Sequence, residues 1–97
     1  MRYEIKLSPE AIEDLKRLKA GPRAQVKKAL ETCLRHEPMK KSKSRIKRLK
    51  GLSKPQYRLR VDDIRVFYDV VKRKVEVLAV VSKVDADAWL SKVGETS

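Results

Sequence analysis

Residues 57–70 read YRLRVDDIRVFYDV, and this segment sets the architecture that the rest of the chain must fit. In its first five residues, apolar side chains alternate with Arg58 and Arg60, and this period of two predicts a strand with one apolar face. Asp62-Asp63 has the chemistry of a tight turn, and the apolar run that follows predicts a second strand. We therefore expect a β-hairpin whose two arginines point away from the core.

The chain before this hairpin predicts one strand and two helices. Residues 3–7 alternate apolar and polar side chains, as a strand does. Ser8-Pro9-Glu10 has the composition of a helix start, with Ser as N-cap and Pro in the first turn. Gly21-Pro22 is expected to end this helix. Apolar residues at helical spacing predict a second helix over residues 22–35, and the short connection implies an antiparallel helical hairpin.

After the β-hairpin, residues 75–81 are almost wholly apolar and predict a third strand suited to a sheet interior. Residues 85–90 predict a short C-terminal helix, and residues 94–97 are expected to form a frayed tail. The result is an α+β fold: an N-terminal strand, an antiparallel two-helix hairpin, a three-stranded antiparallel meander and a short helix. The helical hairpin should cover one face of the sheet and leave Arg58, Arg60 and Arg65 on the other.

Length and composition favour one domain over residues 1–97. The only cysteine, Cys33, reads as a small core residue and fits a reducing cytoplasm. No apolar run approaches the roughly 20 residues that span a bilayer, so we expect a cytoplasmic protein without a membrane partner. The chain has no metal-ligand spacing and no Gly-rich phosphate loop, so we predict no metal and no small-molecule cofactor.

Positive charge is concentrated in residues 38–61, although the whole chain carries a formal charge of +12. A polyanion such as RNA or DNA is the natural partner of such a segment, because each neutralised phosphate releases counterions. The alternative is a solvated basic loop that keeps the protein soluble. The segment holds no Asp or Glu, and its ten basic residues are Lys40, Lys41, Lys43, Arg45, Lys47, Arg48, Lys50, Lys54, Arg58 and Arg60.

Arg58 and Arg60 should project from one face of their strand about 6.8 Å apart, given a rise of roughly 3.4 Å per residue. Adjacent phosphates of a nucleic-acid strand are spaced similarly, and the planar guanidinium suits a phosphate. The alternative is a solvent-facing strand that carries charge for solubility. Any chemistry here would rest on stabilising charge that develops on a phosphate.

Residues 48–52, RLKGL, and residues 57–68, YRLRVDDIRVFY, resemble the RelE/ParE family of toxins from bacterial and archaeal toxin–antitoxin modules. The SPEA opening after the first strand and the helical hairpin also match, so the resemblance covers nearly the whole chain. It implies a RelE-like fold and a cognate antitoxin, often acidic. It also implies a toxin that cleaves mRNA on the ribosome or, in a subset of the family, one that inhibits DNA gyrase.

By this resemblance, Arg58 and Arg60 match basic residues that contact mRNA phosphates, and Arg65 matches the arginine that stabilises the scissile phosphate. Lys83 stands in for the cation at the end of the last strand, and the attacking group is the 2′-hydroxyl of the mRNA. These four are the predicted catalytic residues. The residues predicted to bind RNA are Lys43, Arg45, Lys47, Arg48, Lys50 and Lys54.

The leading hypothesis is a toxin that cuts mRNA in the ribosomal A site. The alternatives are a non-catalytic gyrase inhibitor and a degenerate toxin that acts mainly in a repressor complex with its antitoxin. Tyr68 is a remote candidate for proton transfer, although its alternation favours the core. Trp89 could stack on a base or anchor the core. We expect Arg65 to lie on the surface, so that an Arg65→Ala change leaves the fold intact.

Overall fold

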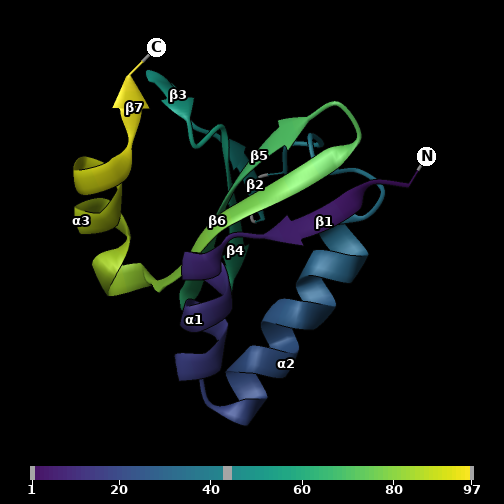
Figure 1. Ribbon diagram of the computed structural model, residues 1–97, viewed down its shortest axis with the longest axis vertical. Helices are drawn as coiled ribbons and strands as arrows, with labels where there is room; N and C mark the ends of the chain where they lie inside the picture. The colour runs from purple at the N-terminus through teal and green to yellow at the C-terminus, as the bar shows by residue number, and fades with distance from the viewer. Residues whose placement is uncertain (1, 43–44, 97) are drawn as a thin grey trace.

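The computed structural model describes residues 2–42 and 45–96, and its α+β architecture confirms the predicted class (Figure 1). None of the helices in these two ranges is long and apolar enough to cross a bilayer. The elements are β1 (Glu4–Leu7), α1 (Pro9–Arg17), α2 (Ala20–Ala29), the π-helical segment η1 (Leu30–Leu34), β2 (Ile46–Arg48), β3 (Leu52–Lys54), β4 (Tyr57–Val61), β5 (Ile64–Val71), β6 (Lys74–Ser82), α3 (Lys83–Val93) and β7 (Glu95–Thr96).

The main sheet has five strands in the order β1-β6-β5-β4-β2. Its centre is the predicted antiparallel meander of β4, β5 and β6. Two edge pairings add to the meander: β1 lies parallel to β6, with Ile5 opposite Val75, and β2 lies antiparallel to β4, with Ile46 opposite Leu59. The pairing of β1 with β6 joins segments that are distant in sequence, and local patterns do not predict it.

Helices α1 and α2 form the predicted hairpin: the chain runs down α1 and returns along α2 (Figure 1). Helix α1 begins at the predicted cap, where the Ser8 hydroxyl accepts a hydrogen bond from the Ala11 N–H at 3.0 Å. The predicted helix end at Gly21-Pro22 is wrong. Helix α1 ends at Arg17, and Gly21-Pro22 lies in the first turn of α2, where proline is tolerated because its N–H would have no intrahelical partner.

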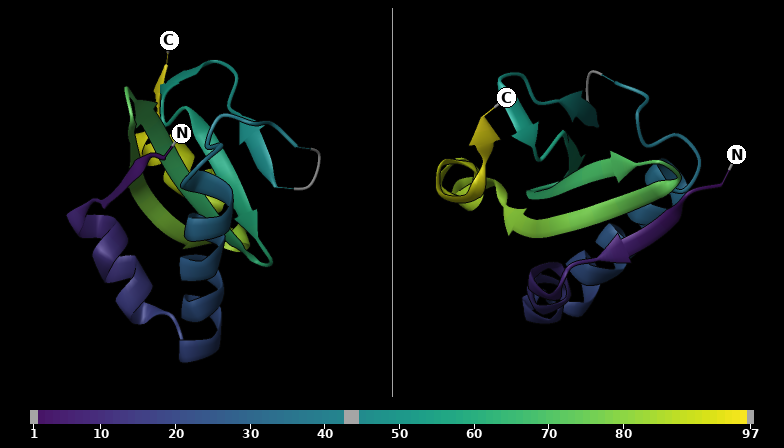
Figure 2. Two further views of the ribbon diagram at one scale, coloured as in Figure 1. Left: turned by 90° about the vertical axis from the view of Figure 1, so that its right-hand side faces the viewer. Right: turned by 45° about the horizontal axis from the view of Figure 1, so that its top comes forward.

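The core lies between this hairpin and the sheet, and Figure 2 shows both helices on the same side of the strands. Ala11 and Leu15 of α1 pack with Val26 of α2 against the apolar face of β4, β5 and β6. Cys33 is partly buried against this core, as predicted. The sheet residues in the cluster include Leu59, Val66, Tyr68, Val75 and Val77.

Helix α3 packs on the opposite side of the sheet, so that face is only partly open (Figure 2). It starts two residues earlier and ends three residues later than predicted. It begins after Ser82, whose hydroxyl accepts a hydrogen bond from the Asp85 N–H at 3.3 Å. Beyond α3, Glu95–Thr96 pairs with β3 as the short strand β7, where the sequence predicts a frayed end. Ser97, the last residue of that predicted tail, lies outside the described residues.

Candidate nucleic-acid interface

The β4–β5 hairpin brings the three predicted arginines onto one face of the sheet. Arg60 lies directly opposite Arg65, and Arg58 lies opposite Phe67. Since cross-strand partners share a face, Arg58, Arg60 and Arg65 all project away from the α1–α2 hairpin. The two-residue turn Asp62-Asp63, predicted from sequence, sets this register, and Asp62 adopts the left-handed conformation with φ 53°, which Asp tolerates better than most residues.

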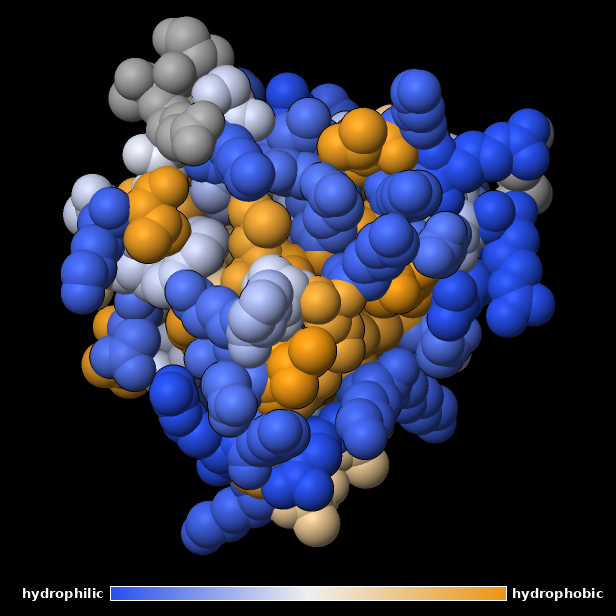
Figure 3. Space-filling view, in the orientation of Figure 1, coloured by the Kyte–Doolittle hydropathy of each residue, from blue (hydrophilic) through white to orange (hydrophobic). Residues whose placement is uncertain are grey.

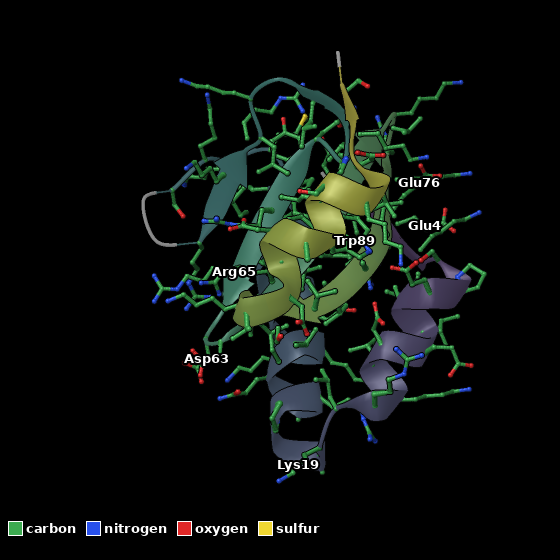
Figure 4. All side chains as sticks on the ribbon, turned by 90° about the vertical axis from the view of Figure 1, so that its left-hand side faces the viewer. Glu4, Lys19, Asp63, Arg65, Glu76 and Trp89 are labelled. Carbon is green, nitrogen blue, oxygen red and sulfur yellow. The ribbon has the colours of Figure 1, made fainter. Side chains whose placement is uncertain are left out.

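Arg65 is not the surface residue that the sequence predicts, because only 8% of it is exposed. Its Nη1 atom donates hydrogen bonds to the carbonyl oxygens of Asp62 at 2.8 Å and Ile64 at 3.1 Å. Burial lowers the pKa of Arg65, the positive charges of Arg58 and Arg60 lower it further, and Asp63 opposes them. Figure 4 shows Arg65 beside α3, at the same end of the sheet as Asp63.

Arg58 and Arg60 have more solvent access than Arg65, and both keep hydrogen-bonding capacity. Arg60 is exposed and Arg58 is partly buried. The Nε atom of Arg58 is buried and has no hydrogen-bond partner within residues 2–42 and 45–96. None of the four ion pairs formed between described residues includes an arginine of this cluster. The cluster is therefore a set of like charges that a bound anion would stabilise.

Lys83, the fourth predicted catalytic residue, lies at the turn end of the same hairpin. It is the exposed first residue of α3, and its backbone N–H donates to the Asp63 carbonyl at 2.7 Å. Residue pairing agrees with this position, because Arg65 lies opposite Val81 and Ile64 lies opposite Ser82. The structure therefore places Lys83 next to the turn that carries the arginines.

Most of the residues predicted to bind RNA gather around β2, in a basic hollow of about 550 Å³ that Arg58 also lines. Lys54 belongs to β3 and does not line this hollow, and Lys43 lies outside the described residues. The Arg48 guanidinium also lies over the Tyr57 ring, 5.2 Å from its centroid. The predicted residues that line the hollow are Arg45, Lys47, Arg48 and Lys50.

Tyr68 and Trp89 are both used structurally. Tyr68 is fully buried, its hydroxyl donates to the Pro38 carbonyl at 2.6 Å, and burial raises the pKa of its phenol. It therefore belongs to the core and is not placed to transfer a proton on the arginine face. Trp89 stacks on Phe67, and its Nε1 atom donates to a carboxylate oxygen of Glu10 at 2.7 Å. Of its two predicted roles, the geometry supports that of an anchor.

A contribution from α2 was not predicted from the sequence. Lys28 lines a second hollow, of about 590 Å³, together with Arg45 and Arg60. Only tertiary packing brings Lys28 to this position, since α2 and β4 are far apart in the chain. In the described part of the chain, no three His, Cys, Asp or Glu side chains come together as a metal site would require.

Several solved structures share this fold. A RelE–RelB complex from the archaeon Pyrococcus horikoshii OT3 is 23% identical, over 86% of this chain and 97% of that chain, with a TM-score of 0.70. The RelBE2 complex from Mycobacterium tuberculosis is 22% identical, over 84% and 99%, with a TM-score of 0.69. The YoeB dimer from Staphylococcus aureus is 21% identical, over 84% and 97%, with a TM-score of 0.63. These similarities confirm the predicted RelE-like fold.

Sequence comparison gives the family. No curated protein sequence matches the chain. The family model described as the ParE toxin of the type II toxin–antitoxin system, parDE, matches residues 5–86, which include all three arginines and Lys83. Because this match spans most of the chain and the fold agrees with it, the protein belongs to the ParE toxins of type II toxin–antitoxin systems, within the RelE/ParE family.

Proposed function

We propose that this toxin binds the sugar–phosphate backbone of mRNA with its arginine cluster and cleaves that mRNA on the ribosome. The observation that supports the proposal is the placement of Arg58, Arg60 and Arg65 on one face, with none of them in an ion pair with a described carboxylate. Like charges held together in this way raise the electrostatic energy of the free protein, and a phosphodiester lowers it.

In the proposed reaction, the RNA 2′-oxygen attacks the adjacent phosphorus and the bond to the 5′-oxygen breaks. The products are a 2′,3′-cyclic phosphate and a 5′-hydroxyl. Charge on the phosphoryl oxygens rises in the transition state, so fixed cations lower its energy more than that of the ground state. Arg65 is the fixed cation, because two carbonyl oxygens hold its Nη1 atom. Exposed Arg60 contacts the incoming phosphate, and Lys83 contacts a neighbouring one.

Proton transfer is the step that this face does not supply by itself. Tyr68 is committed to Pro38 in the core, and the only histidine, His36, follows η1 at the end of the helical hairpin. The proton of the 2′-hydroxyl therefore passes to water or to a group of the ribosome, and the leaving 5′-oxygen takes its proton from water or from such a group. This assignment makes cleavage dependent on the ribosome and predicts no cutting of naked RNA.

A second candidate is inhibition of DNA gyrase by binding alone. Two observations favour it: the matching family model describes ParE toxins, and the arginine face carries no described group placed to transfer a proton. A gyrase inhibitor requires neither cleavage chemistry nor a ribosome. In this case the arginine cluster would contact an acidic surface of the gyrase or its DNA.

We also propose that a cognate antitoxin covers the α1–α2 hairpin. An apolar hollow of about 310 Å³ lies between these helices and β1, lined by Leu7, Ile12 and Leu15. Basic side chains of Lys16, Arg23 and Lys27 surround it, and Figure 3 shows apolar atoms here within a hydrophilic surface. An amphipathic helix with an acidic border fits this combination. The complexes named for the similar structures pair such toxins with antitoxins.

Expression of the toxin alone tests the two candidates. The proposal predicts growth arrest with new mRNA 5′ ends at ribosome-bound codons, and Arg60→Gln abolishes both. Lys19→Gln is the matched control, because Lys19 is an exposed cation at the far end of the helical hairpin (Figure 4). Arrest with intact transcripts and loss of gyrase supercoiling would instead establish the gyrase candidate.

A further inference from the structure

We infer that the nucleic-acid site continues beyond the three arginines, around the β2 edge of the sheet, as a groove that takes consecutive phosphates of a single polynucleotide strand. This groove, called the edge groove below, is formed by Lys28, Arg45, Lys47, Arg48, Arg58 and Arg60. The inference rests on the proposed function, because it takes Arg58 and Arg60 as contacts to a polynucleotide. It adds the path of the strand and the residues that guide it.

The two arginines of β4 line different hollows. Arg60 lines the hollow of about 590 Å³ with Lys28 of α2. Arg58 lines the hollow of about 550 Å³ with Lys47 of β2. Arg45 lines both hollows, and the Arg60 N–H donates to the Arg45 carbonyl at 2.8 Å. The two hollows therefore meet at Arg45, and together they form one continuous basic path.

Two backbone hydrogen bonds and one side-chain contact hold Arg45 in place. Its backbone N–H donates to the Ser42 hydroxyl at 3.1 Å, and its carbonyl accepts from Arg60. Its Nη1 atom lies 3.5 Å from the Cys33 sulfur, a weak contact for a guanidinium. The remaining donors of Arg45 have no described partner, so the residue at the junction keeps most of its capacity for an anion.

The many basic side chains of the edge groove, and a buried donor without a described partner, favour an anion with several charges. The hollow around β2 has six basic residues and no acidic residue in its lining, and the hollow beside α2 has one acid, Asp62. The buried Nε atom of Arg58 also lacks a described partner. A buried donor without a partner destabilises the protein, and a phosphate oxygen that accepted its hydrogen bond would remove that cost.

The path of the groove selects a single strand over a duplex. Lys47 and Arg58 are cross-strand partners on the face away from the α1–α2 hairpin, whereas Lys28 belongs to α2 on the other side. A ligand that touches all three residues must bend around the sheet edge within the width of a few strands. A flexible single strand can do so, but a duplex, with a persistence length of about 50 nm, cannot.

The aromatic side chains near the groove predict contact with phosphates and not with bases. Tyr57 stacks on Tyr68 at 5.4 Å between centroids and lies beneath Arg48, and Trp89 stacks on Phe67. Base-binding surfaces expose aromatic faces for stacking, and none of the residues that line the two hollows is aromatic. The edge groove should therefore bind strands of different sequence with similar affinity.

Fluorescence anisotropy with a labelled oligouridine of about 12 nucleotides tests the edge groove. The variants are Lys28→Gln, Lys47→Gln and Arg45→Gln, with Lys19→Gln as the matched control. Lys28 and Lys47 are exposed, so their variants keep the test valid even if Arg45→Gln fails to fold. Each groove variant should weaken binding and reduce the slope of log K against log[salt] by about 0.7 for each lost phosphate contact. The control should match the parent protein, and a duplex of equal length should bind more weakly.

The outcomes separate this inference from the proposed function. If Arg60→Gln abolishes growth arrest while the three groove variants bind oligouridine like the parent, the edge groove is rejected and the proposed function stands. If the groove variants lose oligouridine binding while the parent toxin leaves transcripts intact in cells, the groove stands and mRNA cleavage is rejected. If the variants weaken binding of polyglutamate but not of oligouridine, the groove takes an acidic protein segment, and the inference is overturned.

Discussion

Trp89 lies flat against Phe67, with ring centroids 4.8 Å apart and ring planes at 11°. Phe67 is fully buried in β5, and the Trp89 indole also donates its N–H to Glu10 of α1 at 2.7 Å. A single side chain of α3 thus connects this helix to the sheet and to the first helix. One face of the indole is therefore already used for packing against Phe67.

Truncation of Trp89 should therefore destabilise the fold. We expect Trp89→Ala to lower the free energy of unfolding by about 2–3 kcal/mol, near the lower end for large aromatic residues because Trp89 is only partly buried. Trp89→Phe keeps the ring stack and loses the hydrogen bond to Glu10, so the loss should be about 1 kcal/mol. Urea denaturation at pH 7 measures both. Unchanged stability combined with weaker oligonucleotide binding would assign Trp89 to base stacking instead.

Tyr68→Phe should lower stability without affecting toxicity. The change leaves the buried Pro38 carbonyl without the phenolic donor, which should lower the free energy of unfolding by about 1–2 kcal/mol. Tyr57→Phe is the control, because the Tyr57 hydroxyl has no described hydrogen bond, and its effect should stay within about 0.5 kcal/mol. Growth arrest should persist in both variants. Loss of arrest by a folded Tyr68→Phe protein would give the phenol a role in proton transfer.

Replacing Arg65 and replacing Arg60 by alanine should have different effects on stability. Arg65→Ala removes a buried guanidinium and its hydrogen bonds to Asp62 and Ile64, so we expect a loss of about 2 kcal/mol. Exposed Arg60 should change stability by less than about 0.5 kcal/mol when replaced by alanine. Thermal unfolding of the two variants measures the difference. Equal stabilities would mean that the carbonyl contacts of Arg65 contribute nothing to the fold.

Local patterns were sufficient for the helical hairpin and the meander. The alternation in residues 57–61 and the turn at Asp62-Asp63 specify the register that places Arg58, Arg60 and Arg65 on one face. The error at Gly21-Pro22 has a physical cause, since Pro and Gly that end one helix are equally compatible with the first turn of the next. The parallel pairing of β1 with β6 depends on long-range contacts that no local pattern encodes.

The site residues that lie on a single strand could be predicted from the sequence. Those whose position depends on packing between elements could not. The basic residues of β2 and β4 could be named because their charge is concentrated in one segment. The burial of Arg65 could not be predicted, because it depends on how α3 packs over the sheet. Lys28 also escaped prediction, since only the position of α2 beside β4 brings it to the hollow that Arg60 lines.

Asp14 gives the protein a pH-dependent stability that can be measured directly. Its side chain is 10% exposed, accepts a hydrogen bond from the Val80 N–H at 2.9 Å and pairs with Arg17 at 3.5 Å. Burial raises the pKa of Asp14 above 3.8, and the charge of Glu10 adds to this, whereas the Val80 hydrogen bond and Arg17 oppose it. The ionised carboxylate is therefore less favourable in the folded state than in the unfolded state.

The sign of the effect follows from proton uptake. With a raised pKa, the folded state binds more protons than the unfolded state just above pH 3.8, so this group contributes more stability as the pH falls through that window. Asp14→Asn removes the charge and keeps an acceptor for Val80. We expect this variant to be more stable than the parent protein at pH 7, with the difference shrinking as the pH approaches about 4.

Glu31→Gln is the matched control, with the opposite sign. Its hydrogen bond with Arg35 lowers the pKa of Glu31 below 4.5, so its contribution is present above that pH and is lost as the pH falls through the folded-state pKa. Glu31→Gln should therefore be less stable than the parent at pH 7 and approach it in acid. Urea denaturation across this range measures both variants. If Asp14→Asn lost stability at pH 7, then Arg17 and Val80 would outweigh the cost of burying the carboxylate, and the direction assigned to its pKa would be wrong.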